Sequence, residues 1–119
     1  MRPGLREAWS GRRGVLLTHP KSREVPCVLS KQVEVPAGQK MVLEFEVNNH
    51  PKGDWLLVVK VDGVAVVTQA IEESVWQAFK VDLSVYAGKT VRLELENRLK
   101  GDWRFEAGYW SGLKIIRSE

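Results

Sequence analysis

The sequence predicts an all-β fold, an antiparallel β-sandwich, and three observations support this prediction. Apolar and polar residues alternate with a period of two in several short segments, as they do in half-buried strands. Turn signals such as Asp62-Gly63 and Ala87-Gly88 recur roughly every 8–12 residues. No segment shows the apolar period of an amphipathic helix. Many short strands with regular turns and without helices are typical of sandwiches.

The first predicted strands lie between residues 33 and 47. The segment 33–35 ends at the turn 36–38, which contains a proline and a glycine. Beyond this turn, Leu43, Phe45 and Val47 alternate with two glutamates. We therefore expect a strand whose Leu, Phe and Val side chains face the core.

A tight hairpin is predicted over residues 55–71. Its strands, Trp55–Val61 and Val64–Ile71, flank the dipeptide Asp62-Gly63. Asp-Gly supplies the positive φ angles that a type I′ turn requires. Both strands are apolar on both faces, so both are expected to be central in a sheet or covered on both sides.

Three more strands complete the prediction, over residues 76–83, 91–95 and 103–116. In the last of these, the odd positions are mostly apolar and the even positions mostly polar. We therefore expect the odd face to lie in the core and the even face in solvent. Trp110 falls on the even face, between Gly108 and Gly112, and is predicted to be an exposed tryptophan.

The charge distribution divides the chain. The formal charge is +3, but residues 1–24 carry six basic and two acidic residues, and residues 25–119 carry twelve basic and thirteen acidic ones. We expect a basic N-terminal arm over residues 1–12 and a β-sandwich domain over residues 13–119. No aromatic-interleaved basic stripe accompanies the arm, so a solvated arm is favoured over nucleic-acid binding. No apolar run approaches the roughly 20 residues of a membrane span, so no membrane partner is expected.

A short motif occurs twice. Lys52-Gly53-Asp54-Trp55 recurs as Lys100-Gly101-Asp102-Trp103, and the same offset of 48 residues aligns Asn49 with Asn97. Two copies of a strand-loop-strand unit suit the pseudo-symmetry of a jelly roll. Asp54 and Asp102 can serve as sugar-binding carboxylates. The favoured interpretation is nevertheless structural, with each tryptophan plugging the sandwich, because a symmetric repeat indicates a packing device more than a site.

Exposed aromatic side chains beside polar ones are the features expected of a sugar-binding site, since sugars present both apolar C–H faces and hydroxyls. Trp110 and Trp76 lie on faces that otherwise look polar and are the candidate platforms. The alternative is that Trp110 is covered by the arm or by a loop. The candidate polar partners are Glu106 and Arg104 on the predicted Trp110 face, Asp54 and Asp102 in the repeated motif, and His50 in the loop before Asp54.

Catalytic and metal-binding signals are weak. The chain has no nucleophile elbow and no glycine-rich phosphate loop. Glu72 and Glu73 are adjacent, so their side chains point apart on a strand and do not form a glycosidase pair. They remain weak candidates for holding a structural calcium ion. We predict no enzyme activity, no resident cofactor and no metal site, and we expect Cys27 to be a small buried hydrophobe.

Four segments carry a resemblance to a known fold family. They are His50-Pro51-Lys52-Gly53-Asp54-Trp55, Val61-Asp62-Gly63, Val81-Asp82-Leu83-Ser84-Val85-Tyr86-Ala87-Gly88-Lys89 and Glu106-Ala107-Gly108-Tyr109-Trp110-Ser111. The chain resembles the galactose-binding-like jelly-roll sandwich of carbohydrate-binding modules in bacterial, planctomycete-type multidomain proteins. This resemblance implies a jelly-roll fold, a sugar ligand, neighbouring domains in a longer parent protein, and an extracytoplasmic location if that parent is secreted.

Three hypotheses for function follow. The first is a noncatalytic carbohydrate-binding module with tryptophan platforms and loop carboxylates. The second is a structural or protein-interaction sandwich, including a homo-oligomer, whose tryptophans are buried in the core. The third is a binder of anionic polymers that acts through the basic arm. No signal peptide is visible in this chain, and the sequence does not predict a location directly.

Overall fold

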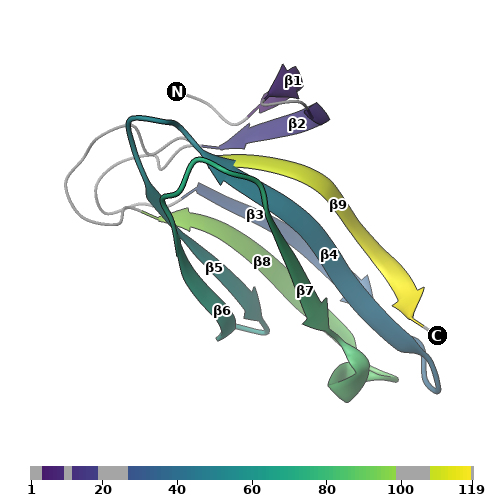
Figure 1. Cartoon of the computed structure of the whole chain (residues 1–119). Coiled ribbons are helices and arrows are strands. Elements are labelled where there is room, and N and C mark those ends of the chain that lie inside the picture. Colours follow the sequence, from purple (N-terminus) through teal and green to yellow (C-terminus); the bar gives the residue numbers. More distant parts are fainter. Residues whose placement is uncertain (1–3, 10–11, 19–26, 99–107, 119) are drawn as a thin grey trace.

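The computed structural model describes residues 4–9, 12–18, 27–98 and 108–118. They form two antiparallel sheets, one of five strands in the order β1-β2-β9-β4-β7 and one of four in the order β3-β8-β5-β6. Figure 1 shows the two sheets as the layers of a sandwich, which confirms the predicted fold class. The elements are β1 (Gly4–Trp9), β2 (Arg12–Thr18), β3 (Cys27–Glu34), β4 (Lys40–Asn49), β5 (Trp55–Val61), β6 (Val64–Ile71), β7 (Gln77–Asp82), the 3₁₀ helix η1 (Ser84–Tyr86), β8 (Thr90–Arg98) and β9 (Gly108–Ser118).

The predicted hairpin is formed by β5 and β6. Asp62 and Gly63 have φ angles of 50° and 82°, as a tight turn of this kind requires. Asp62 also ties the turn to β8, because its Oδ1 accepts a 2.8 Å hydrogen bond from the amide of Arg92. The prediction that both strands are covered is correct for β5, which lies between β8 and β6. It is wrong for β6, which is an edge strand with Val64 66% exposed.

The core lies between the sheets and contains the predicted alternating rows. Leu43, Phe45 and Val47 of β4 are buried, as is the corresponding row of β8, Val91, Leu93 and Leu95. The two copies of the internal repeat therefore place their apolar rows on different sheets, and both rows belong to one core cluster. Cys27 is buried, as expected from the sequence.

Strand β9 does not keep one alternation along its length. Glu44 of β4 is opposite Lys114, but Glu46 is opposite Ser111, so two steps on β4 match three on β9. This register shift is a β-bulge, and it includes Gly112, whose φ is +64°. One extra residue exchanges the inward and outward faces, because strand side chains alternate with a period of two.

The N-terminal residues add a hairpin to one end of the larger sheet. β1 lies within the segment expected to be an arm, and it pairs with β2. β2 in turn pairs with the first three residues of β9 (Figure 1). The sequence did not predict this strand, and the domain boundary after residue 12 stays a prediction. Among the described residues, no helix is long and apolar enough to cross a membrane.

Candidate functional site

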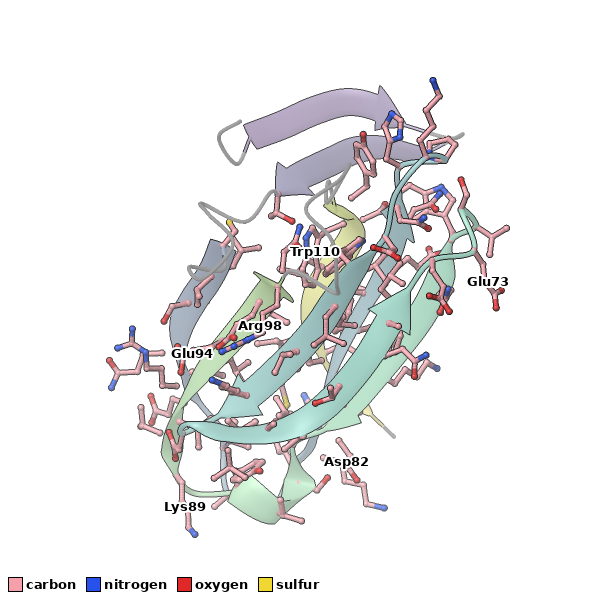
Figure 2. All side chains as sticks on the ribbon, turned by 90° about the vertical axis from the view of Figure 1, so that its left-hand side faces the viewer. Glu73, Asp82, Lys89, Glu94, Arg98 and Trp110 are labelled. Carbon is pink, nitrogen blue, oxygen red and sulfur yellow. The ribbon has the colours of Figure 1, made fainter. Side chains whose placement is uncertain are left out.

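Two loops meet at the end of the sandwich where β4 ends. Residues 50–54 connect β4 to β5, and residues 72–76 connect β6 to β7 (Figure 1). In Figure 2, Glu73 lies at this end, and Asp82 and Lys89 lie at the opposite end. Of the predicted site residues, His50, Asp54 and Trp76 lie in these two loops, and all three are half-buried.

Asn49, the last residue of β4, connects the two loops through hydrogen bonds of its side chain. Its Nδ2 donates to the carbonyls of His50 and Gly53, at 3.0 and 2.7 Å. Its Oδ1 accepts a 2.7 Å bond from the amide of Ser74, in the neighbouring loop. Asn49 is 1% exposed, so these bonds satisfy a buried amide. The internal repeat drew attention to Asn49 by aligning it with Asn97. Its bridging role was not predicted, because it depends on the hydrogen bond to Ser74, 25 residues away.

The loop that carries His50 and Asp54 is a compact turn. The Gly53 amide donates to the carbonyl of His50, at 2.9 Å. The Lys52 amide donates to Nδ1 of His50, at 3.0 Å. Because Nδ1 accepts a hydrogen bond, a neutral His50 carries its proton on Nε2. These bonds fix the loop backbone and the plane of the imidazole.

In the neighbouring loop, Trp76 is the last residue before β7, just as Asp54 is the last residue before β5. The preceding residue, Val75, is 51% exposed, and Glu72 and Glu73 are also exposed. Ser74 adopts a φ of +56°, which turns the chain sharply just before Trp76. The structure thus places a half-buried indole, an imidazole and several carboxylates on two loops whose backbones Asn49 connects.

The expectation that Trp110 is exposed is wrong. Trp110 is 1% exposed and belongs to the core cluster between the two sheets. The bulge at Gly112 is the reason: Trp110 comes before the bulge and shares a face with Val47, its partner on β4, instead of with the outward residues. Its Nε1 donates to Oγ1 of Thr18, at 2.8 Å, so the buried indole is also satisfied. Trp110 is therefore a core residue.

Trp55, from the first copy of the repeated motif, is also part of the core. It is 0% exposed, and its Nε1 donates to the carbonyl of Asn48, at 3.1 Å. This confirms the packing interpretation for Trp55. The second copy, with Asp102, lies outside the described residues.

The predicted site residues Asp102, Arg104 and Glu106 lie in the segment 99–107, outside the described residues, and their roles stay predictions. The described residues on either side of that segment, Arg98 and Gly108, are at the same end of the sandwich as the two loops. Arg98 pairs with Leu56, and Gly108 pairs with Asn49.

No metal centre is evident in the described part of the chain. Among those residues, no three His, Cys, Asp or Glu side chains are grouped closely enough to hold a metal ion. Glu72 and Glu73 were weak candidates for calcium ligands. Among the described residues, no third His, Cys, Asp or Glu side chain joins them in such a group.

Two compact antiparallel sheets with loops gathered at one end define a β-sandwich of the kind seen in carbohydrate-binding modules. The xylan-binding domain CBM22-1 of Paenibacillus barcinonensis Xyn10C superposes with a TM-score of 0.64 and 14% identity, over 98% of this chain and 80% of that one. A family 35 carbohydrate-binding module from an environmental isolate gives 0.58 and 15%, over 98% and 88%. A CBM4 structure gives 0.57 and 11%, over 90% and 73%.

A Paenibacillus cycloisomaltooligosaccharide glucanotransferase also matches, with a TM-score of 0.52 and 14% identity, but over only 16% of that enzyme. No protein-family model and no curated protein sequence matches this chain. At identities this low, the similarities establish the fold, and they confirm the fold resemblance noted in the sequence.

Proposed function

We propose that this chain is a noncatalytic carbohydrate-binding module whose sugar site lies in the loops 50–54 and 72–76. Trp76 is the stacking platform, and Asp54 and His50 are the polar partners for sugar hydroxyls. The observation that carries the proposal is the bridge from Asn49 to both loops, which connects the loop of Trp76 to the loop of His50 and Asp54.

Three lines of support agree. The fold is shared with modules that are named as binding carbohydrate. An aromatic face with a few placed polar groups suits the C–H faces and hydroxyls of a sugar. The loops are positioned by backbone hydrogen bonds, so little ordering is needed on binding, and this lowers the entropic cost. Asp102, Arg104 and Glu106 are proposed as further contacts, since the residues that flank them in the described chain, Arg98 and Gly108, pair with Leu56 and Asn49 at this end of the sandwich.

Glycan-array screening followed by calorimetry on the best oligosaccharide tests this function. Trp76→Ala should weaken binding at least about five-fold, since an aromatic contact contributes roughly 1 kcal/mol or more. Val85→Ala is the matched control, because it truncates an exposed apolar side chain in η1, outside both loops, and should leave affinity unchanged. A folded native chain that binds no glycan, or a Trp76→Ala variant that binds normally, would refute the proposal.

The second candidate function is a structural or protein-interaction module that assembles through a sheet edge. The burial of Trp55 and Trp110 is what this hypothesis expects. In addition, the edge strand β6 carries no charged residue, and Val64 and Val66 are 66% and 41% exposed. Uncharged apolar edge strands favour pairing with another strand. Light scattering tests this second function. A stable oligomer that is disrupted by Val66→Lys would support assembly through β6, and a monomer at high concentration would contradict it.

A further inference from the structure

A groove of about 420 Å³ opens on one side of the sandwich, and its lining contains no residue of the loops 50–54 and 72–76. Its walls come from both sheets: β3 and β8 on one side, β4 and β9 on the other. The volume lies in the range of about 300–1,000 Å³ that is usual for small-molecule pockets. Six lining residues are apolar: Leu29, Leu43, Leu93, Leu95, Leu113 and Ile115. Lys31, Lys114 and a serine complete the lining.

The groove exists because two strand edges leave this side of the sandwich open. β3 is the edge of the smaller sheet. On the larger sheet, β2 pairs only with Gly108–Trp110, and no other described strand lies beyond β9 on that side (Figure 1). Leu93 and Leu95, which belong to the core, are therefore reached from outside through the gap between the sheets.

Lys31 occupies an unusual position at this opening. It lies between Leu29 and Val33, which share its face of β3 and pack against the core. Its partner on β8 is Leu93, one of the groove leucines. Lys31 is exposed, and none of the other described residues forms an ion pair with it. A positive charge thus stands in a row of apolar side chains at the rim of an apolar groove.

Lys114 supplies a second positive charge at the rim. Its Nζ lies 3.9 Å from Oε1 of Glu44, and the same carboxylate also contacts Nζ of Lys80, at 3.6 Å. One partly exposed carboxylate is therefore shared by two ammonium groups, which leaves Lys114 only partly neutralised. An apolar interior with two cations at its mouth is complementary to a ligand that has an apolar tail and an anionic head.

We propose that this groove binds an amphipathic anion, a single alkyl chain ending in a carboxylate, as in a medium-chain fatty acid. The tail contacts Leu93 and Leu95 and is removed from water, which is favourable in proportion to the apolar area buried. The carboxylate accepts charge-assisted hydrogen bonds from Lys31 and Lys114.

A competing explanation assigns Lys31 to the protection of an edge strand, because an inward-pointing charge discourages edge-to-edge pairing. The two explanations make different predictions for Lys31→Glu. Charge reversal keeps a charge on the edge, so protection is preserved. It also places a carboxylate beside the head of the bound anion, so ligand binding is lost.

Calorimetry with sodium dodecanoate below its micelle concentration is the direct test, using the full chain. Dodecanoate should bind stoichiometrically, and decanoate roughly ten-fold more weakly, because two fewer methylenes are buried. Dodecyltrimethylammonium should bind at least ten-fold more weakly than dodecanoate. In methyl NMR spectra, dodecanoate should shift Leu29, Leu93 and Leu95 most strongly.

Two charge-reversal variants complete the experiment. Lys31→Glu should weaken dodecanoate binding at least ten-fold, and Lys89→Glu, at an exposed turn at one end of the sandwich, should leave it unchanged (Figure 2). Circular dichroism should show both variants folded, because both lysines are exposed. Absence of dodecanoate binding, equal affinity for the cationic surfactant, equal weakening by both variants, or methyl shifts confined to other residues would each overturn the proposal.

Discussion

The rings of Trp55 and Trp110 contact each other across the two sheets, with centroids 5.2 Å apart and planes tilted by 48°. The ring of Trp110 also contacts that of Phe45, with centroids 5.5 Å apart, and the ring of Phe45 stacks on that of Phe79. This chain of rings runs from β5 through β9 and β4 to β7. Tilted aromatic pairs stabilise a core beyond the area that they bury. Trp110, one of the two tryptophans that the sequence offered as ligand platforms, thus helps to connect the two sheets.

Trp110→Phe should destabilise the protein by about 2–3 kcal/mol, because it removes part of a buried ring and leaves the Thr18 hydroxyl without its indole donor. Urea unfolding monitored by circular dichroism measures this change. Trp76→Phe is the control: Trp76 is half-buried in a loop, so we expect less than about 1 kcal/mol. Equal losses in the two variants would contradict the burial of Trp110.

Gly108→Ala should destabilise the protein by about 2 kcal/mol or more. A Cβ at this position would lie 2.8 Å from Cε2 of Trp55, 2.9 Å from Nδ2 of Asn97 and 3.0 Å from Oγ1 of Thr18. These three groups are buried and hydrogen-bonded, so they cannot move freely, and overpacking such a site is costly. Thermal unfolding followed by calorimetry would show the effect as a lowered Tm.

The comparison for Gly108→Ala is Gly112→Ala. Gly112 has open space around its Cα but a φ of +64°, so the cost there is the left-handed backbone, about 1 kcal/mol. If Gly112→Ala were the more damaging of the two, the close packing around Gly108 would not be the dominant constraint.

The sequence predicted the fold class, the Asp62-Gly63 turn and the apolar rows of β4 and β8, because each depends on local patterns. It misplaced Trp110, because a one-residue bulge reverses the alternation and its only local sign is Gly112. The link from Trp110 to Thr18 joins residues 92 apart, and no local pattern reveals such a contact. Of the candidate site, Trp76, Asp54 and His50 were predicted singly, but the bridge that brings their loops together was not.

Asp82 should titrate below the usual range of an aspartate. The Ser84 hydroxyl and the Ser84 amide, which donates a 2.9 Å hydrogen bond to Oδ1, stabilise its carboxylate and lower its pKa, and Lys40 adds a smaller effect. A lowered pKa in the folded state means that this contribution to stability is complete above the unfolded pKa and is lost as the pH falls through the folded value. Carboxyl-carbon NMR should give a midpoint below about 3.9, the ordinary value for aspartate.

The matched variant for Asp82 is Ser84→Ala, which removes the hydroxyl and keeps the amide donor. The pKa of Asp82 should then move part of the way back toward its ordinary value. A midpoint that is unchanged in Ser84→Ala would show that the hydroxyl does not contribute. Because Asp82 is fully exposed, we expect no large change in overall stability from this substitution.

Asn49→Ala should loosen the two loops of the proposed site and destabilise the fold by about 2–3 kcal/mol, since three partners of a buried amide are lost. The specific readout is the amide of Ser74, which donates to Oδ1 of Asn49 and should exchange with solvent much faster in the variant. Glu73→Ala, at an exposed neighbour, controls for general loop effects and should leave that exchange unchanged. If sugar binding depends on these loops, Asn49→Ala should weaken it even though Asn49 is buried. Normal affinity together with fast Ser74 exchange would mean that the sugar is bound elsewhere.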